Sequence, residues 1–175
     1  MGTPKLQDRL LAFDPTPAGL ILEPLRTAEK NLWAKLRKEH FADGYYICEL
    51  CAVAEERAPL IHAHEVYSYP TPKLVLLDKV IFICTRCHDA IHFERTRARC
   101  QPPYVQAITD HYCRVNGGLS EKAFKADVKE CLALTLNIRE YYGGAQATPT
   151  IDYGPYQDIV DEMIAKRTWR KLGLR

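Results

Sequence analysis

The sequence lacks the features that define several large classes of protein. No apolar run approaches the roughly 20 residues that a membrane-spanning helix needs, so we expect no membrane partner. The opening residues, MGTPKLQDRLLAF, carry Asp8 and Arg9 where a secretory signal needs an unbroken apolar stretch, and we therefore expect a cytoplasmic protein. Glycine-rich phosphate loops, nucleophile elbows and paired-carboxylate motifs are also absent, so P-loop nucleotide hydrolysis, serine-hydrolase chemistry and glycoside hydrolysis have no support.

Neither the composition nor the net charge is extreme. The 175 residues are 47% hydrophobic and 26% charged, with a net charge of +2, which fits a globular chain rather than a disordered or fibrous one. Contact with nucleic acid would therefore need a local basic patch. The seven cysteines are an odd number, and a disulfide framework is not expected in a reducing compartment.

The hydrophobic periodicity predicts a single compact domain of the α+β class. Alternating apolar residues predict a strand over 60–69, and a nearly continuous apolar run predicts one or two buried strands over 73–84. Helical spacing, with Ser120 as one N-cap, predicts helices over 24–40, 87–98, 103–115, 121–142 and 155–171. We expect three parts, namely an N-terminal arm (1–24), a finger with its preceding helix (25–100) and a C-terminal helical region packed on the finger (101–175).

Two C-x-x-C pairs form the strongest motif. Thiolates bind zinc tetrahedrally, and each pair supplies two sulfurs from one tight turn, so two pairs complete a four-sulfur site. The sequence therefore predicts a structural zinc held by Cys48, Cys51, Cys84 and Cys87. Buried or redox-active thiols are the alternative interpretation of the same motif.

Four of the six histidines fall close to this motif. His62 and His64 are two residues apart on a predicted strand, so they point to the same face. His88 and His92 are four residues apart on the helix that follows the second C-x-x-C pair, so they share a helical face. A neutral imidazole at pH 7 is a metal ligand or a general base, and four together indicate a site.

These motifs resemble the HNH endonuclease family. The stretches CELC, HAHEVYSY and VIFICTRCHDAIH look like its zinc-knuckle, ββα-metal subgroup with an "aHEvW.Y" strand, and DHYCRVNG and TIDYG are similar to the C-terminal part of that subgroup. The resemblance implies a zinc-bound ββα-metal (HNH) finger embedded among flanking α-helices. It also implies an enzyme that hydrolyses phosphodiester bonds of nucleic acid, with DNA as the expected substrate and partner.

The resemblance assigns a role to each residue by position. His64 would be the general base that deprotonates the attacking water. His88 and His92 would be ligands of a second divalent metal such as Mg²⁺ or Mn²⁺. That metal would be needed because a zinc closed by four sulfurs has no open coordination position.

Three positions depart from the family pattern. Ala63 stands where active members place a metal-ligating Asp or His, Lys79 stands where the central asparagine is expected, and Glu65 replaces an aliphatic residue. His62 is a candidate for the missing ligand. A catalytically inactive zinc module that binds nucleic acid or a partner protein therefore stays open as an alternative function, and a redox-responsive thiol protein is a third hypothesis.

A basic stretch follows the predicted metal ligands. Candidate nucleic-acid-binding residues on and after the finger helix are Arg86, Arg95, Arg97 and Arg99. Arginine beside a metal suits phosphate binding, whereas a solvated helix face is the plain alternative.

Overall fold

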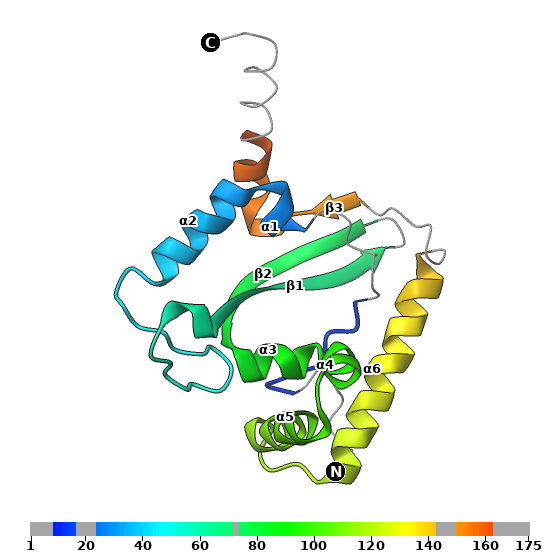
Figure 1. Cartoon of the computed structure of the whole chain (residues 1–175). Helices are drawn as coiled ribbons and strands as arrows, with labels where there is room; N and C mark the ends of the chain where they lie inside the picture. The colour runs from blue at the N-terminus through cyan, green and yellow to red at the C-terminus, as the bar shows by residue number, and fades with distance from the viewer. Residues whose placement is uncertain (1–8, 17–23, 72–73, 143–149, 163–175) are drawn as a thin grey trace.

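The computed structural model describes residues 9–16, 24–71, 74–142 and 150–162. A long β-hairpin lies at its centre, with helices around it (Figure 1). Strand β1 (Ile61–Thr71) pairs antiparallel with β2 (Leu74–Cys84), and the short β3 (Thr150–Asp152) joins β2 in parallel. The sheet order is β1-β2-β3, and the fold class is mixed α+β, as the sequence predicts.

The hairpin register places the predicted histidines on one face. Ile61 pairs with Cys84 and His64 pairs with Ile81, so the end of β2 lies opposite the start of β1. Successive side chains of a strand alternate between its faces. His62 and His64 accordingly point the same way, and both rings lie beside the ring of His88.

Two short helices follow β2 where the sequence predicts one. His92 separates helix α3 (Thr85–Ile91) from helix α4 (Phe93–Arg99). His92 has φ −95° and ψ 43°, which departs from helical geometry. The prediction of an unbroken helix over 87–98 is therefore wrong at this residue. The carbonyl of Ile91 at the break accepts a hydrogen bond from the amide of Asp14 (3.0 Å), so a distant segment stabilises the bend.

Two further helices precede the hairpin. Helix α1 (Leu25–Ala28) and helix α2 (Lys30–His40) are separated at Glu29, which has φ −134° and ψ 76° and is 1% exposed. The prediction of one helix over 24–40 is wrong at this point. Side chains of both helices pack in one cluster with Leu77 of β2, so tertiary packing overrides the helical pattern of the sequence.

The C-terminal helices agree closely with the sequence. Helix α5 (Pro102–Val115) begins at a proline, which suits a first helical turn. Helix α6 (Glu121–Tyr141) begins after Ser120, whose hydroxyl accepts a hydrogen bond from the amide of Ala123 (3.3 Å). Two 3₁₀ turns, η2 (Ala58–Leu60) and η4 (Gly154–Tyr156), complete the described elements. Of the predicted helix over 155–171, residues 157–162 are α-helical, residues 155 and 156 lie in the 3₁₀ turn η4, and residues 163–171 lie outside the described residues.

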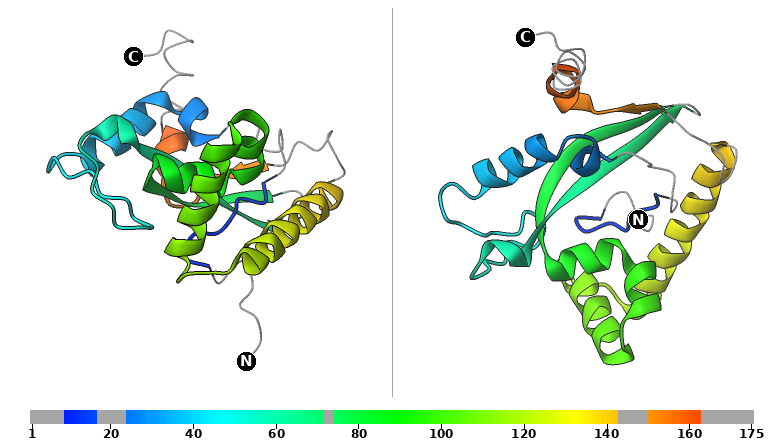
Figure 2. Two further views of the ribbon diagram at one scale, coloured as in Figure 1. Left: turned by 60° about the horizontal axis from the view of Figure 1, so that its bottom comes forward. Right: turned by 45° about the horizontal axis from the view of Figure 1, so that its top comes forward.

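The described part of the N-terminal arm, residues 9–16, runs between the hairpin and α6 (Figure 2). Asn116 binds both backbone groups of Leu11, with its Oδ1 accepting from the amide (3.1 Å) and its Nδ2 donating to the carbonyl (2.9 Å). Phe13 stacks on Tyr112 with ring centroids 4.3 Å apart. Leu11 and Phe13 are buried in the main core with residues of α3, α4, α5 and α6. No described helix has the length and apolar character needed to cross a membrane.

A buried ion pair fixes the start of this arm to α6. Arg9 donates to both carboxylate oxygens of Asp127 (2.8 and 3.0 Å), and the Tyr112 hydroxyl donates to the same carboxylate (3.0 Å). The side chains of Arg9 and Asp127 are only 7% and 4% exposed. Removal of one partner would leave a buried charge without compensation, which is costly.

We predict that Asp127→Ala lowers the free energy of unfolding by about 3–5 kcal/mol, because the Arg9 guanidinium stays buried without its partner. Urea denaturation of the metal-loaded protein measures this change. The matched control is Glu121→Ala on the same helix, since Glu121 pairs with Lys125 (2.7 Å) in full contact with solvent. An Asp127 variant as stable as this control would show that the pair does not anchor the arm.

Candidate functional site

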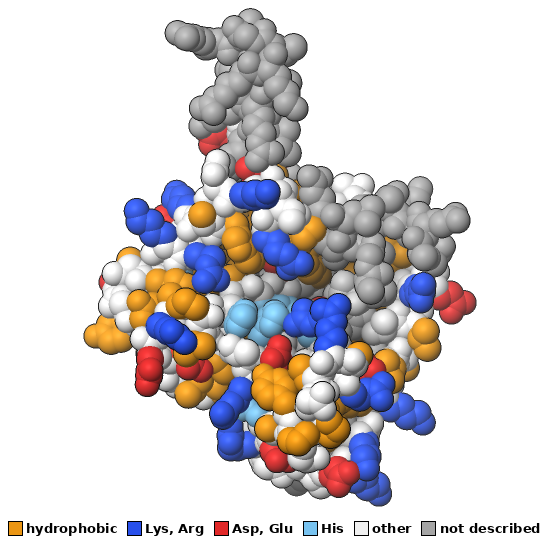
Figure 3. Space-filling model, in the orientation of Figure 1, with side chains coloured by type: hydrophobic (Ala, Val, Ile, Leu, Met, Phe, Trp, Pro, Cys, Tyr) orange, Lys and Arg blue, Asp and Glu red, His pale blue; other side chains and the backbone are white. Residues whose placement is uncertain are grey.

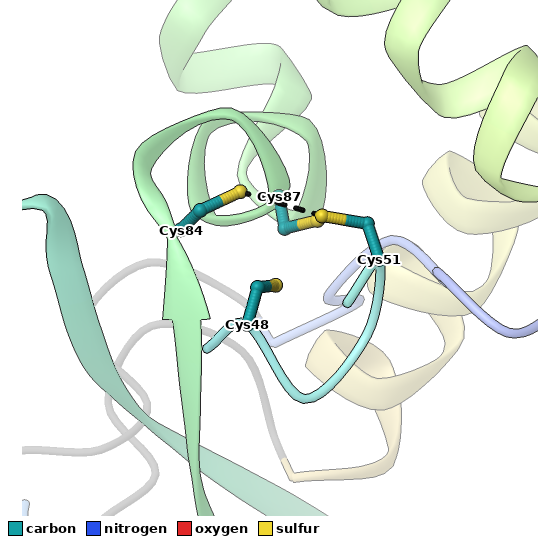
Figure 4. Close-up of side chains that lie close together, drawn as sticks. All are labelled: Cys48, Cys51, Cys84 and Cys87. Carbon is teal, nitrogen blue, oxygen red and sulfur yellow. Dashed lines mark hydrogen bonds between the residues drawn. The ribbon is translucent and has the colours of Figure 1, made fainter. Parts of the chain in front are cut away.

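Four cysteine side chains meet at the junction of β2 and α3 (Figure 4). Cys84 is the last residue of β2 and Cys87 lies in the first turn of α3, whereas Cys48 and Cys51 come from the loop between α2 and η2. Their four Sγ atoms lie within 4.8 Å of one another, and those of Cys51 and Cys84 are 3.7 Å apart. The cluster that the C-x-x-C motifs predict is present, and it can hold a metal ion.

Backbone hydrogen bonds hold the first cysteine pair in a tight turn against β2. The carbonyl of Cys48 accepts from the amide of Ala52 (2.9 Å), which has a positive φ of 57°, and the amide of Cys48 donates to Val53 (2.9 Å). The amide of Glu49 donates to the carbonyl of Phe82 (3.0 Å), while the Glu49 carboxylate accepts from the Phe82 amide (2.8 Å). These bonds position two sulfurs beside the other two.

The thiols of the cluster cannot all ionise on their own. Hydrogen bonds from Cys84 and Cys87 lower the pKa of Cys48, so this thiol is the first to become a thiolate. The same hydrogen bond raises the pKa of Cys84 to about 12, and the pKa of Cys87 is also raised. A divalent cation removes this restriction because it binds thiolates and releases their protons. The donor set therefore fits a thiophilic divalent ion.

His111 of α5 contacts the cluster although no sequence motif points to it. Its Nε2 lies 3.1 Å from Sγ of Cys87, and its Nδ1 accepts from the guanidinium of Arg114 (2.8 Å). The Arg114 contact places the imidazole proton on Nε2, so His111 donates to the sulfur. His111 is 3% exposed, and burial lowers its pKa. The neutral ring is a suitable outer partner for a metal-binding thiolate.

Three histidines form a second cluster. His64 of β1, His88 of α3 and His92 at the break between α3 and α4 offer ligand atoms that lie within 4.8 Å of one another. Ring centroids are 5.0 Å apart for His64 and His92 and 4.9 Å for His88 and His92. Residues far apart in the sequence thus converge as the spacing predicts.

The imidazoles of this cluster are neutral near pH 7. Burial lowers the pKa of His88 to about 3 and that of His92 to about 2, and the neighbouring histidines and Arg95 add to the effect. Burial also lowers the pKa of His64, against the opposing charge of Asp14. Neutral imidazole is the form that ligates a metal or accepts a proton.

His62 lies beside the three-histidine cluster rather than in it. Its ring stacks on that of His88 with centroids 4.6 Å apart. Its Nε2 lies 3.0 Å from the hydroxyl of Thr85, at the start of α3. The structure therefore brings His62 to the edge of the site, with one ring nitrogen already paired.

The histidines line a cavity of about 800 Å³ that opens to the surface (Figure 3). Of the four arginines predicted to bind nucleic acid, only Arg95 lines this cavity. Arg97 pairs with Glu94 (2.7 Å). Arg86 and Arg99 are exposed to solvent outside the cavity. Sequence reasoning missed the other cavity-lining residues of note, which are Asp14, Arg26, Trp33 and Arg37. They come from the arm, α1 and α2, where no motif marks them.

Comparison with known proteins gives no relative for this chain. No protein-family model, no curated protein and no solved structure matches it. Its function must therefore be inferred from the geometry of the two clusters and of the cavity.

We predict that His111→Phe increases the rate at which the cysteine cluster loses its metal to a chelator by about tenfold, because the Cys87 sulfur loses its hydrogen-bond donor. A chromogenic chelator measures the release. His111→Gln is the control, since its amide can still donate to the sulfur and should keep release near the wild-type rate. Equal rates for the phenylalanine variant and the wild type would contradict the proposed contact.

Proposed function

We propose that this protein is an HNH-type endonuclease that uses a divalent metal to hydrolyse phosphodiester bonds of nucleic acid, with DNA as the expected substrate. The observation that carries the proposal is the cluster of three neutral histidines from β1 and the α3–α4 break, which lines an arginine-flanked cavity. Phosphodiester hydrolysis needs a base that deprotonates water and positive charge beside the phosphate. The histidines and arginines of the cavity could supply both.

The cysteine cluster supports this role because it could hold a structural zinc. Two antiparallel strands followed by α3, with a thiol cluster at the β2–α3 junction, agree with the zinc-knuckle ββα-metal finger that the sequence resemblance implies. Binding of zinc by four thiolates has an apparent free energy of about 10–16 kcal/mol in small zinc domains, and this energy contributes to folding. The ion would thereby hold α3, and with it His88, against the hairpin.

His64 is the proposed general base. It is 8% exposed and lies on β1, opposite the two histidines of the α3 segment. Its lowered pKa keeps the imidazole neutral, so a ring nitrogen can take a proton from water near pH 7. Its fixed place on a paired strand limits the directions from which water can approach.

His88 and His92 are the proposed ligands of the catalytic metal. Their low pKa values mean that no proton must leave before they bind a cation. When bound, a divalent cation supplies positive charge where the phosphate oxygens become more negative. Arg95 lies on the same side, 3.4 Å from Nδ1 of His88, and its guanidinium can bind a phosphate oxygen of the nucleic-acid backbone.

A non-catalytic zinc module is the second candidate function, and two residues favour it. Ala63 lines the cavity without a donor atom at the position where active family members place a ligand. Lys79 is exposed and pairs in register with Val66, so it supplies no asparagine-like partner for His64. Under this alternative the cavity would bind nucleic acid or a partner protein without cutting it.

We predict that His64→Ala reduces nicking of supercoiled plasmid DNA in Mn²⁺ by about 10²–10⁴-fold, because water loses its base. Agarose electrophoresis of the plasmid measures cleavage, and titration with Mn²⁺ measures metal affinity. If His64 is the base, Mn²⁺ affinity stays close to the wild-type value; a parallel loss of affinity would make His64 a third ligand instead.

The control for this experiment is His40→Ala, since His40 stacks on Phe82 and does not line the cavity. It should cleave as the wild type does. Undiminished cleavage by the His64 variant, or no cleavage by the metal-loaded wild type, would overturn the nuclease proposal, and the second result would favour the non-catalytic module.

We predict that Cys84→Ser lowers zinc from one ion per chain to well below one and destabilises the fold, because the β2–α3 junction loses a sulfur ligand. Elemental analysis and thermal unfolding measure the two effects. The wild-type protein should also release zinc as the pH falls from 7 to 5, since protons compete for the thiolates. The control Cys100→Ser, at an exposed free cysteine, should change neither the zinc content nor the unfolding temperature. A Cys84 variant that retains zinc would contradict the assignment.

A further inference from the structure

The three-histidine cluster contains no carboxylate from the hairpin. Position 63 is alanine, and Glu65 uses both carboxylate oxygens on Arg26, with Oε1 accepting from its amide (3.1 Å) and Oε2 from its guanidinium (2.8 Å). A histidine that ligates a metal commonly donates its second ring N–H to a carboxylate or a carbonyl, which fixes the tautomer and the orientation of the ring. A carboxylate partner for these rings would therefore come from another part of the chain.

The N-terminal arm brings a carboxylate to this place. Asp14 lines the cavity, and its Oδ2 lies 3.6 Å from Nδ1 of His92. The Asp14 side chain is 21% exposed and that of His92 is 24% exposed, so water screens the contact only in part. Contacts at catalytic sites are often long in the free protein and shorten when the site fills.

Hydrogen bonds of its amide, its carbonyl and one carboxylate oxygen fix the position of Asp14. Its amide donates to the carbonyl of Ile91 (3.0 Å), directly before His92, and its carbonyl accepts from the Cys131 thiol of α6 (3.7 Å). Its Oδ1 accepts from the amide of Thr16 (2.8 Å), which leaves Oδ2 for His92. The arm itself is held by Arg9, as described above. The fold therefore directs the Asp14 carboxylate toward the His92 ring.

We propose that Asp14 is a positioning residue of the histidine centre: its carboxylate accepts the Nδ1–H of His92 and turns Nε2 of that ring toward the metal that His88 also binds. The proposal rests on the proposed function, since it assumes a divalent metal at the histidines. It makes the N-terminal arm part of the site, and it supplies the carboxylate that Ala63 cannot provide.

The test uses Co²⁺ alone as the probe, titrated into full-length protein whose cysteine cluster holds zinc. Asp14→Asn is the main variant, because the amide oxygen can keep the bond to Thr16 while the NH₂ group faces the Nδ1–H of His92. We expect its Co²⁺ affinity to fall by about 10–100-fold with zinc content and melting temperature unchanged. The matched control is Glu94→Gln, which also removes one negative charge from the cavity, at a carboxylate paired with Arg97. The Co²⁺ affinity of this variant should stay within about threefold of the wild-type value.

The outcomes distinguish the role of Asp14 from the proposed function. Equal Co²⁺ affinity in the wild type and Asp14→Asn, or an equal loss in Glu94→Gln, would overturn the role of Asp14 while leaving the proposed nuclease intact. No Co²⁺ binding by the wild type would overturn both. Should Asp14→Asn fail to fold, Asp14→Ser tests the same point, since a serine hydroxyl can accept the Thr16 amide without supplying a carboxylate; retained affinity in that variant contradicts the proposal.

Discussion

The cysteine cluster at the end of β2 is the constraint on which the rest of the site depends. Cys84 ends the strand, Cys87 lies in the first turn of the helix, and His88 is the next residue. Any rotation of α3 about its axis would therefore move the histidine away from His64 on the opposite strand. Hydrogen bonds among the thiols shift the pKa values of Cys48, Cys84 and Cys87, and a bound divalent cation would stabilise their thiolates together. In the proposed function, a metal ion bound by these sulfurs would hold the histidines in place without taking part in the reaction itself.

Elements with a strong local signal could be predicted from the sequence. Alternating residues predict β1, a nearly continuous apolar run predicts β2, and Ser120 predicts the start of α6. The paired cysteines predict the thiol cluster, because the C-x-x-C spacing fixes a tight turn. The histidine spacing also predicts the convergence of His64 with His88, since residues on one strand face meet one helix face.

Features that depend on contacts between distant segments could not be predicted. The break at His92 is stabilised by the amide of Asp14, and nothing in the local sequence around the histidine indicates it. His111 reaches Cys87 only because α5 packs against α3, and its sequence context is that of an ordinary helix. The proposed roles of the residues, and the division of the chain at residues 24 and 100, likewise remain predictions from the sequence.

Segments that precede and follow the hairpin in the sequence complete the cavity. The arm contributes Asp14, α2 contributes Trp33 and Arg37, and α6 contributes Leu132 to its wall. This combination places an aromatic side chain and positively charged side chains around the histidines, and the proposed nucleic-acid substrate would contact both. The helices around the hairpin therefore shape the site as well as stabilising it.

Anomalous scattering from crystals grown with zinc and Mn²⁺, measured at the absorption edge of each metal, tests the account most directly. The account predicts a zinc peak about 2.3 Å from each of the four sulfurs and a separate Mn²⁺ peak beside the rings of His88 and His92, the proposed ligands. A disulfide in place of the zinc, or a cavity whose histidines bind no Mn²⁺, would contradict it.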